Sequence, residues 1–238
     1  MSDLPAPIRV PYRLAGTALS TVLAAGSALR HARVFHPVGV AYAVTVDVEP
    51  DGTGPWGAPL LDRPATLTGL VRLSRGTGLP DGLPDVLGLA LRLTDAHGPG
   101  RHQDLLVNTA GRGPLVRQVF LPARGFGTGR YSSVLPYRVG AARVLFGARP
   151  VGPGDLRTFA ELDRAAAAGA LRFRLEVARP GGRWRPVGTI TVGERLPAEV
   201  AEELRFNVNE HTGGGIAPVG ALQELRRQSY RLSQRHRP

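Results

Sequence analysis

Residues 39–48 read GVAYAVTVDV, a run rich in β-branched residues that begins at a glycine and is followed closely by a proline. Runs of this composition, bounded by Gly, Pro or Asp, are typical of β-strands. Further runs of the same kind occupy residues 65–73, 88–94, 104–108, 142–148, 171–177 and 187–192. Because the connections among the first four suit a meander, the sequence predicts an antiparallel sheet of about eight strands, closed or strongly coiled.

Helices are expected beside this sheet. Residues 155–170, DLRTFAELDRAAAAGA, read as a helix with Asp155 as its N-cap. A segment rich in small residues at 14–29 reads as an amphipathic helix, and a last helix is expected at about 220–234. The prolines among the first dozen residues favour an extended arm over residues 1–13. The expected fold class is therefore α+β, an antiparallel barrel with flanking helices.

The composition fits a globular protein with one core. The chain has 238 residues, of which 42% are hydrophobic and 21% charged, so we expect a single domain over residues 1–238. No stretch approaches the roughly 18 consecutive apolar residues of a membrane-spanning helix, and we expect a cytoplasmic location. The alternative interpretation, in which residues 14–29 form a weak export signal, stays open.

Cysteine is absent, which excludes disulfides, zinc thiolate sites, thiol nucleophiles and a cysteine-ligated haem. The formal net charge is +11, and all 30 basic residues are arginine. Such a basic balance can indicate a nucleic-acid or acidic membrane partner. Because the arginines are spread along the chain and aromatic residues make up only 6%, we do not expect nucleic-acid binding.

Two short motifs near the ends of the chain make chemical sense as a pair. RVFH at residues 33–36 contains His36, and RRQSY at residues 226–230 contains Tyr230 with Arg226 four residues before it. Tyrosine is a documented axial ligand of haem iron. A phenol ionises near pH ~10, so a coordinating phenolate needs Fe³⁺ and a neighbouring cation such as a guanidinium. Together the motifs describe the two faces of a bound haem.

Several segments, in order, resemble the catalase-like haem proteins, particularly short members with little beyond the barrel. RVFHPVGVAYAVTVDV resembles the family's distal-histidine segment, and LVRLSR is similar to its arginine-and-serine strand. LPDVLGLALRL followed by QDLLVN resembles the segment that leads to the distal asparagine. RPVGTITV resembles the family's strand before its C-terminal segment. The segment from LRFN through Tyr230 to Arg237 resembles the family's proximal segment, which contains an R-x-x-x-Y motif. The agreement in order carries the resemblance, because each motif alone is weak.

The resemblance implies ferric haem b as the cofactor. It makes Tyr230 the iron ligand and Arg226 its charge partner. The residues that would bind the haem propionates, a role suited to planar guanidinium groups, are Arg33, Arg72 and Arg237.

The resemblance also implies the groups on the opposite face of the haem. His36 becomes the acid/base that takes a proton from a peroxide and returns it. Ser74 would fix the ring orientation of that histidine through a hydrogen bond. Asn108 would orient the bound peroxide.

The expected function is that of a peroxidase or hydroperoxide-converting oxidoreductase. Residues 109–113 read TAGRG where the family usually has a proline and a phenylalanine cluster, so we expect a wider pocket that favours a larger hydroperoxide over rapid dismutation of hydrogen peroxide. One alternative is an isomerase or dehydratase that rearranges an organic hydroperoxide. Another is a non-catalytic barrel, with or without haem. Assembly into a homo-oligomer is possible in each case.

Overall fold

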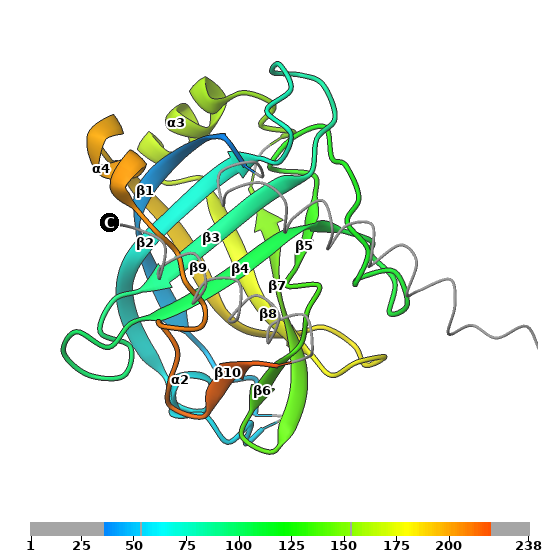
Figure 1. Ribbon diagram of the computed structural model, residues 1–238, viewed down its shortest axis with the longest axis vertical. Helices are drawn as coiled ribbons and strands as arrows, with labels where there is room; N and C mark the ends of the chain where they lie inside the picture. The colour runs from blue at the N-terminus through cyan, green and yellow to red at the C-terminus, as the bar shows by residue number, and fades with distance from the viewer. Residues whose placement is uncertain (1–35, 53, 153, 220–238) are drawn as a thin grey trace, which may run out of the picture. The chain divides into compact units, whose positions relative to one another are not determined.

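Antiparallel strands form a closed barrel in the computed structural model, which describes residues 36–52, 54–152 and 154–219 (Figure 1). In barrel order the strands are β1 (Val38–Val48), β2 (Ala65–Arg75), β3 (Leu87–Leu93), β4 (Gln103–Ala110), β5 (Arg130–Ser132), β7 (Ala142–Val151), β8 (Arg172–Ala178) and β9 (Arg185–Arg195). Pairing of β9 with β1 closes the ring. Two short strands, β6 (Tyr137–Val139) and β10 (Ile216–Pro218), extend the sheet from one end of β7. The predicted antiparallel barrel of about eight strands is confirmed.

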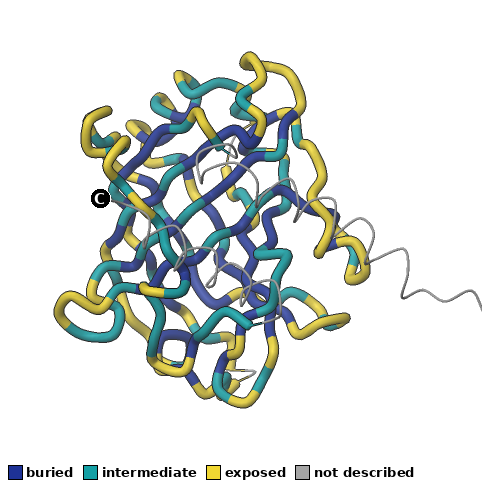
Figure 2. Tube along the Cα trace, viewed as in Figure 1, coloured by how far each residue is buried: buried dark blue, intermediate teal, exposed yellow. Residues whose placement is uncertain are grey.

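Along the barrel strands, buried residues recur at alternate positions, with less buried residues between many of them (Figure 2). Tyr42, Val44 and Val46 of β1 are buried in the core cluster, whereas Thr45 between them is exposed. In β3, Leu87 and the alternate leucines after it belong to the same core. Because successive residues of a strand point to opposite faces, Gly88, Ala90 and Arg92 of β3 belong to the outer face. Of the candidate functional residues that the structure describes, Arg72 and Ser74 on β2 and Asn108 on β4 lie on that outer face.

Each of the seven segments that the sequence predicts corresponds to an observed strand. These strands are β1 to β4 and β7 to β9, and their ends differ from the predicted ones by at most three residues. β5 completes the ring between β4 and β7 but is only three residues long, RYS at 130–132. A run this short has no alternation to detect, so the sequence does not predict it.

The predicted helix at 155–170 is shorter than expected. Helix α3 spans Phe159–Ala167, and its N-cap is Thr158, so the assignment of Asp155 as the cap is wrong. The Thr158 hydroxyl accepts a hydrogen bond from the backbone N–H of Glu161, and the Glu161 carboxylate accepts one from the backbone N–H of Thr158. This reciprocal pair satisfies two N–H groups at the helix start. Asp155 instead forms an ion pair with Arg157.

Two further helices are short, α2 (Pro59–Asp62) and α4 (Ala198–Glu203). Within the described residues, no helix is long and apolar enough to span a bilayer. The arm expected at 1–13 and the helices expected at 14–29 and 220–234 lie outside the described residues. A single domain over residues 1–238 stays a prediction.

A buried ion pair ties the segment after α4 to the outer face of the barrel. The Asp104 side chain, on β4, is fully buried and accepts two hydrogen bonds of 2.8 Å from the Arg92 guanidinium on β3. One oxygen of the same carboxylate accepts from the backbone N–H of Asn207 at 2.7 Å and lies 3.0 Å from Nδ1 of His211. The backbone N–H of Asp104 donates to the carbonyl of His211 at 2.8 Å. One carboxylate therefore holds two strands and a distant segment together.

Candidate functional site

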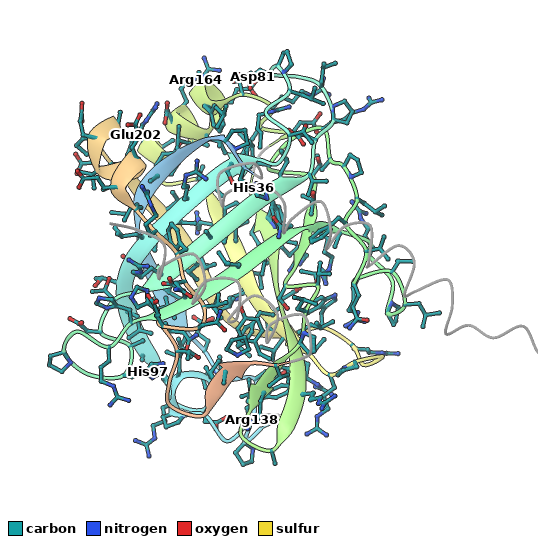
Figure 3. All side chains as sticks on the ribbon, in the orientation of Figure 1. His36, Asp81, His97, Arg138, Arg164 and Glu202 are labelled. Atoms are coloured by element: carbon teal, nitrogen blue, oxygen red, sulfur yellow. The ribbon has the colours of Figure 1, made fainter. Side chains whose placement is uncertain are left out.

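Residues from four neighbouring strands line up across the outer face of the barrel. In register they are Gly39 on β1, Ser74 on β2, Gly88 on β3 and Asn108 on β4. His36 precedes β1, with φ of 65° and a hydrogen bond of 2.9 Å from its N–H to the carbonyl of Gly76. Figure 3 labels His36 over this face of the barrel. The strand register thus places two glycines and two polar residues side by side, next to the imidazole of His36.

The imidazole of His36 is held by side chains from two strands. Ser74 is buried, with 4% of its surface exposed. Its hydroxyl forms a hydrogen bond of 3.0 Å with Nδ1 of His36. The Asn108 side chain is a second hydrogen-bonding partner of the same ring. The structure therefore brings together His36, Ser74 and Asn108, three residues whose catalytic roles stay predictions.

The environment lowers the pKa of His36 below its usual value of 6.5. Burial of the ring is the main cause, because it disfavours the charged imidazolium, and the positive charge of Arg72 acts in the same direction. The carboxylate of Asp85, a hydrogen bond with the backbone of Ser74 and one with the Asn108 side chain raise the pKa and only partly offset these effects. At neutral pH the ring is therefore uncharged and able to accept a proton.

Arg72 lies on the same outer face, two residues before Ser74 on β2. Its Nη2 donates a hydrogen bond of 3.2 Å to the backbone carbonyl of His36. Its guanidinium passes close to Gly39, where an added Cβ would lie 2.9 Å from Cζ of Arg72. A cationic group thus stands beside the imidazole.

Gly88 provides the space in which the imidazole lies. A Cβ added at Gly88 would be 2.6 Å from Cε1 and 2.8 Å from Nδ1 of His36, and 2.9 Å from the Ser74 hydroxyl. The sequence does not single out Gly88 as a site residue. The available signal is a glycine inside a strand, which often marks close approach by another group, but only the cross-strand register shows which group approaches.

Substitution of Gly88 by Ala is expected to displace the imidazole of His36, because the added methyl group would overlap both ring and hydroxyl. The ring then becomes more exposed, and its pKa should move upward towards 6.5. Titration of the imidazole resonances by NMR measures both changes.

The control is Gly193→Ala on β9, where the added Cβ would meet its nearest atom, the carbonyl oxygen of Ala43, at 3.5 Å. This is an ordinary contact, so the His36 signals should not change. An unchanged His36 titration in the Gly88→Ala variant would show that the imidazole does not pack against Gly88.

The remaining residues predicted for the site are Arg33, Arg226, Tyr230 and Arg237, and all four lie outside the described residues. Within the described part of the chain, no cluster of three or more His, Cys, Asp or Glu side chains could hold a metal ion. The described geometry therefore covers one side of the expected site, the side that carries His36.

The chain is similar in fold to catalases. Its sequence matches no protein-family model and no curated protein. Among solved structures, a bacterial catalase superposes with a TM-score of 0.61 at 16% identity, over 98% of this chain and 62% of that one. A fungal catalase gives a TM-score of 0.60 at 14% identity, over 100% of this chain and 66% of that one. The chain thus spans less than two thirds of either catalase, and at this identity the likeness establishes a catalase-like fold alone.

Proposed function

We propose that this chain with a catalase-like fold is a haem-dependent peroxidase or hydroperoxide-converting oxidoreductase. The observation that carries the proposal is the imidazole of His36, hydrogen-bonded to Ser74 and Asn108 over Gly88. A neutral, buried and oriented imidazole is the group that general acid/base catalysis at neutral pH requires. Its position on the outer face of the barrel places it beside β2 to β4, and in this proposal the substrate lies against these strands.

The residues around His36 fit one face of a haem. Gly88 leaves the strand surface low beside Ser74, and the imidazole fills that space. In this proposal the haem lies against the opposite side of the ring. Arg72 offers a guanidinium of the kind that binds a propionate. In this proposal Arg33 and Arg237 bind propionates as well, and Tyr230 is the iron ligand with Arg226 as its charge partner. When bound, ferric haem would supply the metal that activates a peroxide.

In this proposal the protein itself transfers one proton, through the imidazole of His36. Because Nδ1 of His36 is engaged with the Ser74 hydroxyl, we assign proton transfer to Nε2. This nitrogen accepts the proton of a hydroperoxide and returns it to the departing oxygen. The Asn108 amide, which already contacts the ring, orients the hydroperoxide beside it. A cytoplasmic location and a homo-oligomeric state stay predictions.

Absorbance spectroscopy of the full-length chain tests the haem assignment. The protein reconstituted with hemin is expected to give a Soret band with high-spin ferric features. The variant Tyr230→Phe should lose this band, because phenylalanine has no oxygen to coordinate iron. Tyr12→Phe is the matched control and should retain the band.

Two results would overturn parts of the proposal. Wild-type protein that stays colourless with hemin would favour the non-catalytic barrel. A Soret band that is unchanged in Tyr230→Phe would place the iron ligand elsewhere. If haem binds, product analysis separates the two enzyme alternatives, because an isomerase or dehydratase consumes an organic hydroperoxide without any electron donor.

A further inference from the structure

A cleft of about 490 Å³ opens where β4 ends and β5 begins. Its lining comes from the end of β4, the start of β5 and the loops around them, with Ala110, Arg112, Leu121, Arg124, Thr128, Arg130, Asp155 and Arg157 among the residues. A volume of this size accommodates a small organic molecule. None of these residues belongs to the site around His36.

The cleft lies next to that site along the same ladder. Asn108 of β4 pairs with Ser132 of β5, and Ala110 pairs with Arg130. Residues two apart on a strand point to the same face and are separated by about 7 Å. Ala110 and Arg130 are therefore the next pair on the face that carries Asn108. The lining of the cleft therefore begins one residue pair beyond Asn108 on this face.

Positive charge dominates the lining. Asp155 is the only acidic side chain among the described lining residues, and it pairs with Arg157. Arg112 donates a hydrogen bond to the carbonyl of Thr128 at 3.4 Å. Within the described part of the chain, neither Arg112 nor Arg124 forms an ion pair. Two guanidinium groups of the cleft thus have no described carboxylate partner.

Arg130 adds a partly buried donor. Its Nη2 lies 2.9 Å from Glu176, but its buried Nε has no hydrogen-bond partner among the described residues. Burial lowers the pKa of Arg130, and the positive charges of Arg149 and Arg112 lower it further, while Glu176 raises it. An anion in the cleft would relieve the repulsion between these cations.

Apolar side chains adjoin the arginines. Leu121 lines the cleft and is 45% exposed. The turn just before it exposes Leu115, Val116 and Phe120, with Leu115 at 89%. Exposed apolar side chains grouped in one short segment often mark a binding surface. The cleft therefore offers cationic groups for a charged head and an apolar rim for a hydrocarbon tail.

We propose that the cleft binds the anionic head group of an organic molecule with an apolar tail, and that this molecule is the substrate of the neighbouring His36 site. The second part rests on the proposed function, whereas the binding site itself does not. Arg112 and Arg124 hold the head group, and Leu121 with the turn before it contacts the tail.

Calorimetric titration of the haem-free protein tests the binding site directly. Decanoate and decyl phosphate offer two anionic head groups on the same tail, and decanol offers the tail alone. We expect at least one of the anions to bind more tightly than decanol. The double variant Arg112→Gln with Arg124→Gln should weaken anion binding about tenfold or more, because each charged hydrogen bond contributes about 1.5–3 kcal/mol.

The matched control is Arg138→Gln, on β6 at the lower end of Figure 3, away from His36. Its affinity for the anions should equal that of the wild type. Equal affinity for decanol and for both anions, or an unchanged affinity in the double variant, would overturn the anion site. Anion binding by a protein that takes up no haem would leave the site intact and refute its link to the His36 reaction.

Discussion

Replacing Asp104 with Ala is expected to lower the free energy of unfolding by about 3–5 kcal/mol, the cost of removing one partner from a buried ion pair. The Asp104 side chain is fully buried, and Arg92, which makes two hydrogen bonds to it, is 14% exposed in its side chain. Without the carboxylate, the guanidinium keeps its charge but loses its anionic partner. The backbone N–H of Asn207 loses its acceptor as well. Chemical denaturation with urea measures the change.

The matched control is Glu49→Ala, which removes one partner of the surface pair with Arg174. The Glu49 side chain is 66% exposed and lies 3.4 Å from its partner. Exposed pairs of this kind contribute about 0–1 kcal/mol because water screens them. If the Asp104→Ala variant were destabilised no more than the Glu49→Ala variant, the buried pair would not hold the segment after α4 in place.

The barrel could be predicted because its strands are long and regular. From Tyr42 onward, the run GVAYAVTVDV alternates between buried and less buried residues, and the structure places it in β1 with one residue added. The start of α3 was misplaced because both Asp155 and Thr158 suit an N-cap by residue type. Only the presence of Glu161 three residues after Thr158, which completes a capping box, distinguishes them.

The site around His36 was predictable in part from the sequence. The positions of Ser74 and Asn108 follow from a family resemblance, and the strand register places both beside the imidazole. Gly88 was not predicted, because its role depends on which residues face it across two neighbouring strands. The cleft at the end of β4 was not predicted either, because its lining residues come from β4, β5 and loops that are far apart in the sequence. Sequence patterns within one segment carry no information on such pairing.

Replacing His36 with Gln is expected to lower kcat/KM for hydroperoxide turnover by about 10²–10⁴-fold, the usual contribution of a general acid/base. Glutamine is polar and keeps a hydrogen-bonding group near Ser74, but it cannot accept and return a proton at neutral pH. Haem uptake should not change, because the proposed iron ligand is Tyr230. Stopped-flow kinetics of the reconstituted variant give the rate, and the Soret band of the same sample gives its haem content. His102→Gln, which alters a partly exposed histidine paired with Asp95, is the matched control.

The pH dependence of the same reaction provides a second measure of the role of His36. A base must be neutral to act, so wild-type turnover should fall as the pH drops through the pKa of His36. Because burial and Arg72 lower this pKa, the midpoint of the acid limb should lie below 6.5, and turnover should persist in mildly acidic solution. The remaining turnover of the His36→Gln variant should lack this limb. A variant that retains the full rate, or the same acid limb, would show that another group transfers the proton.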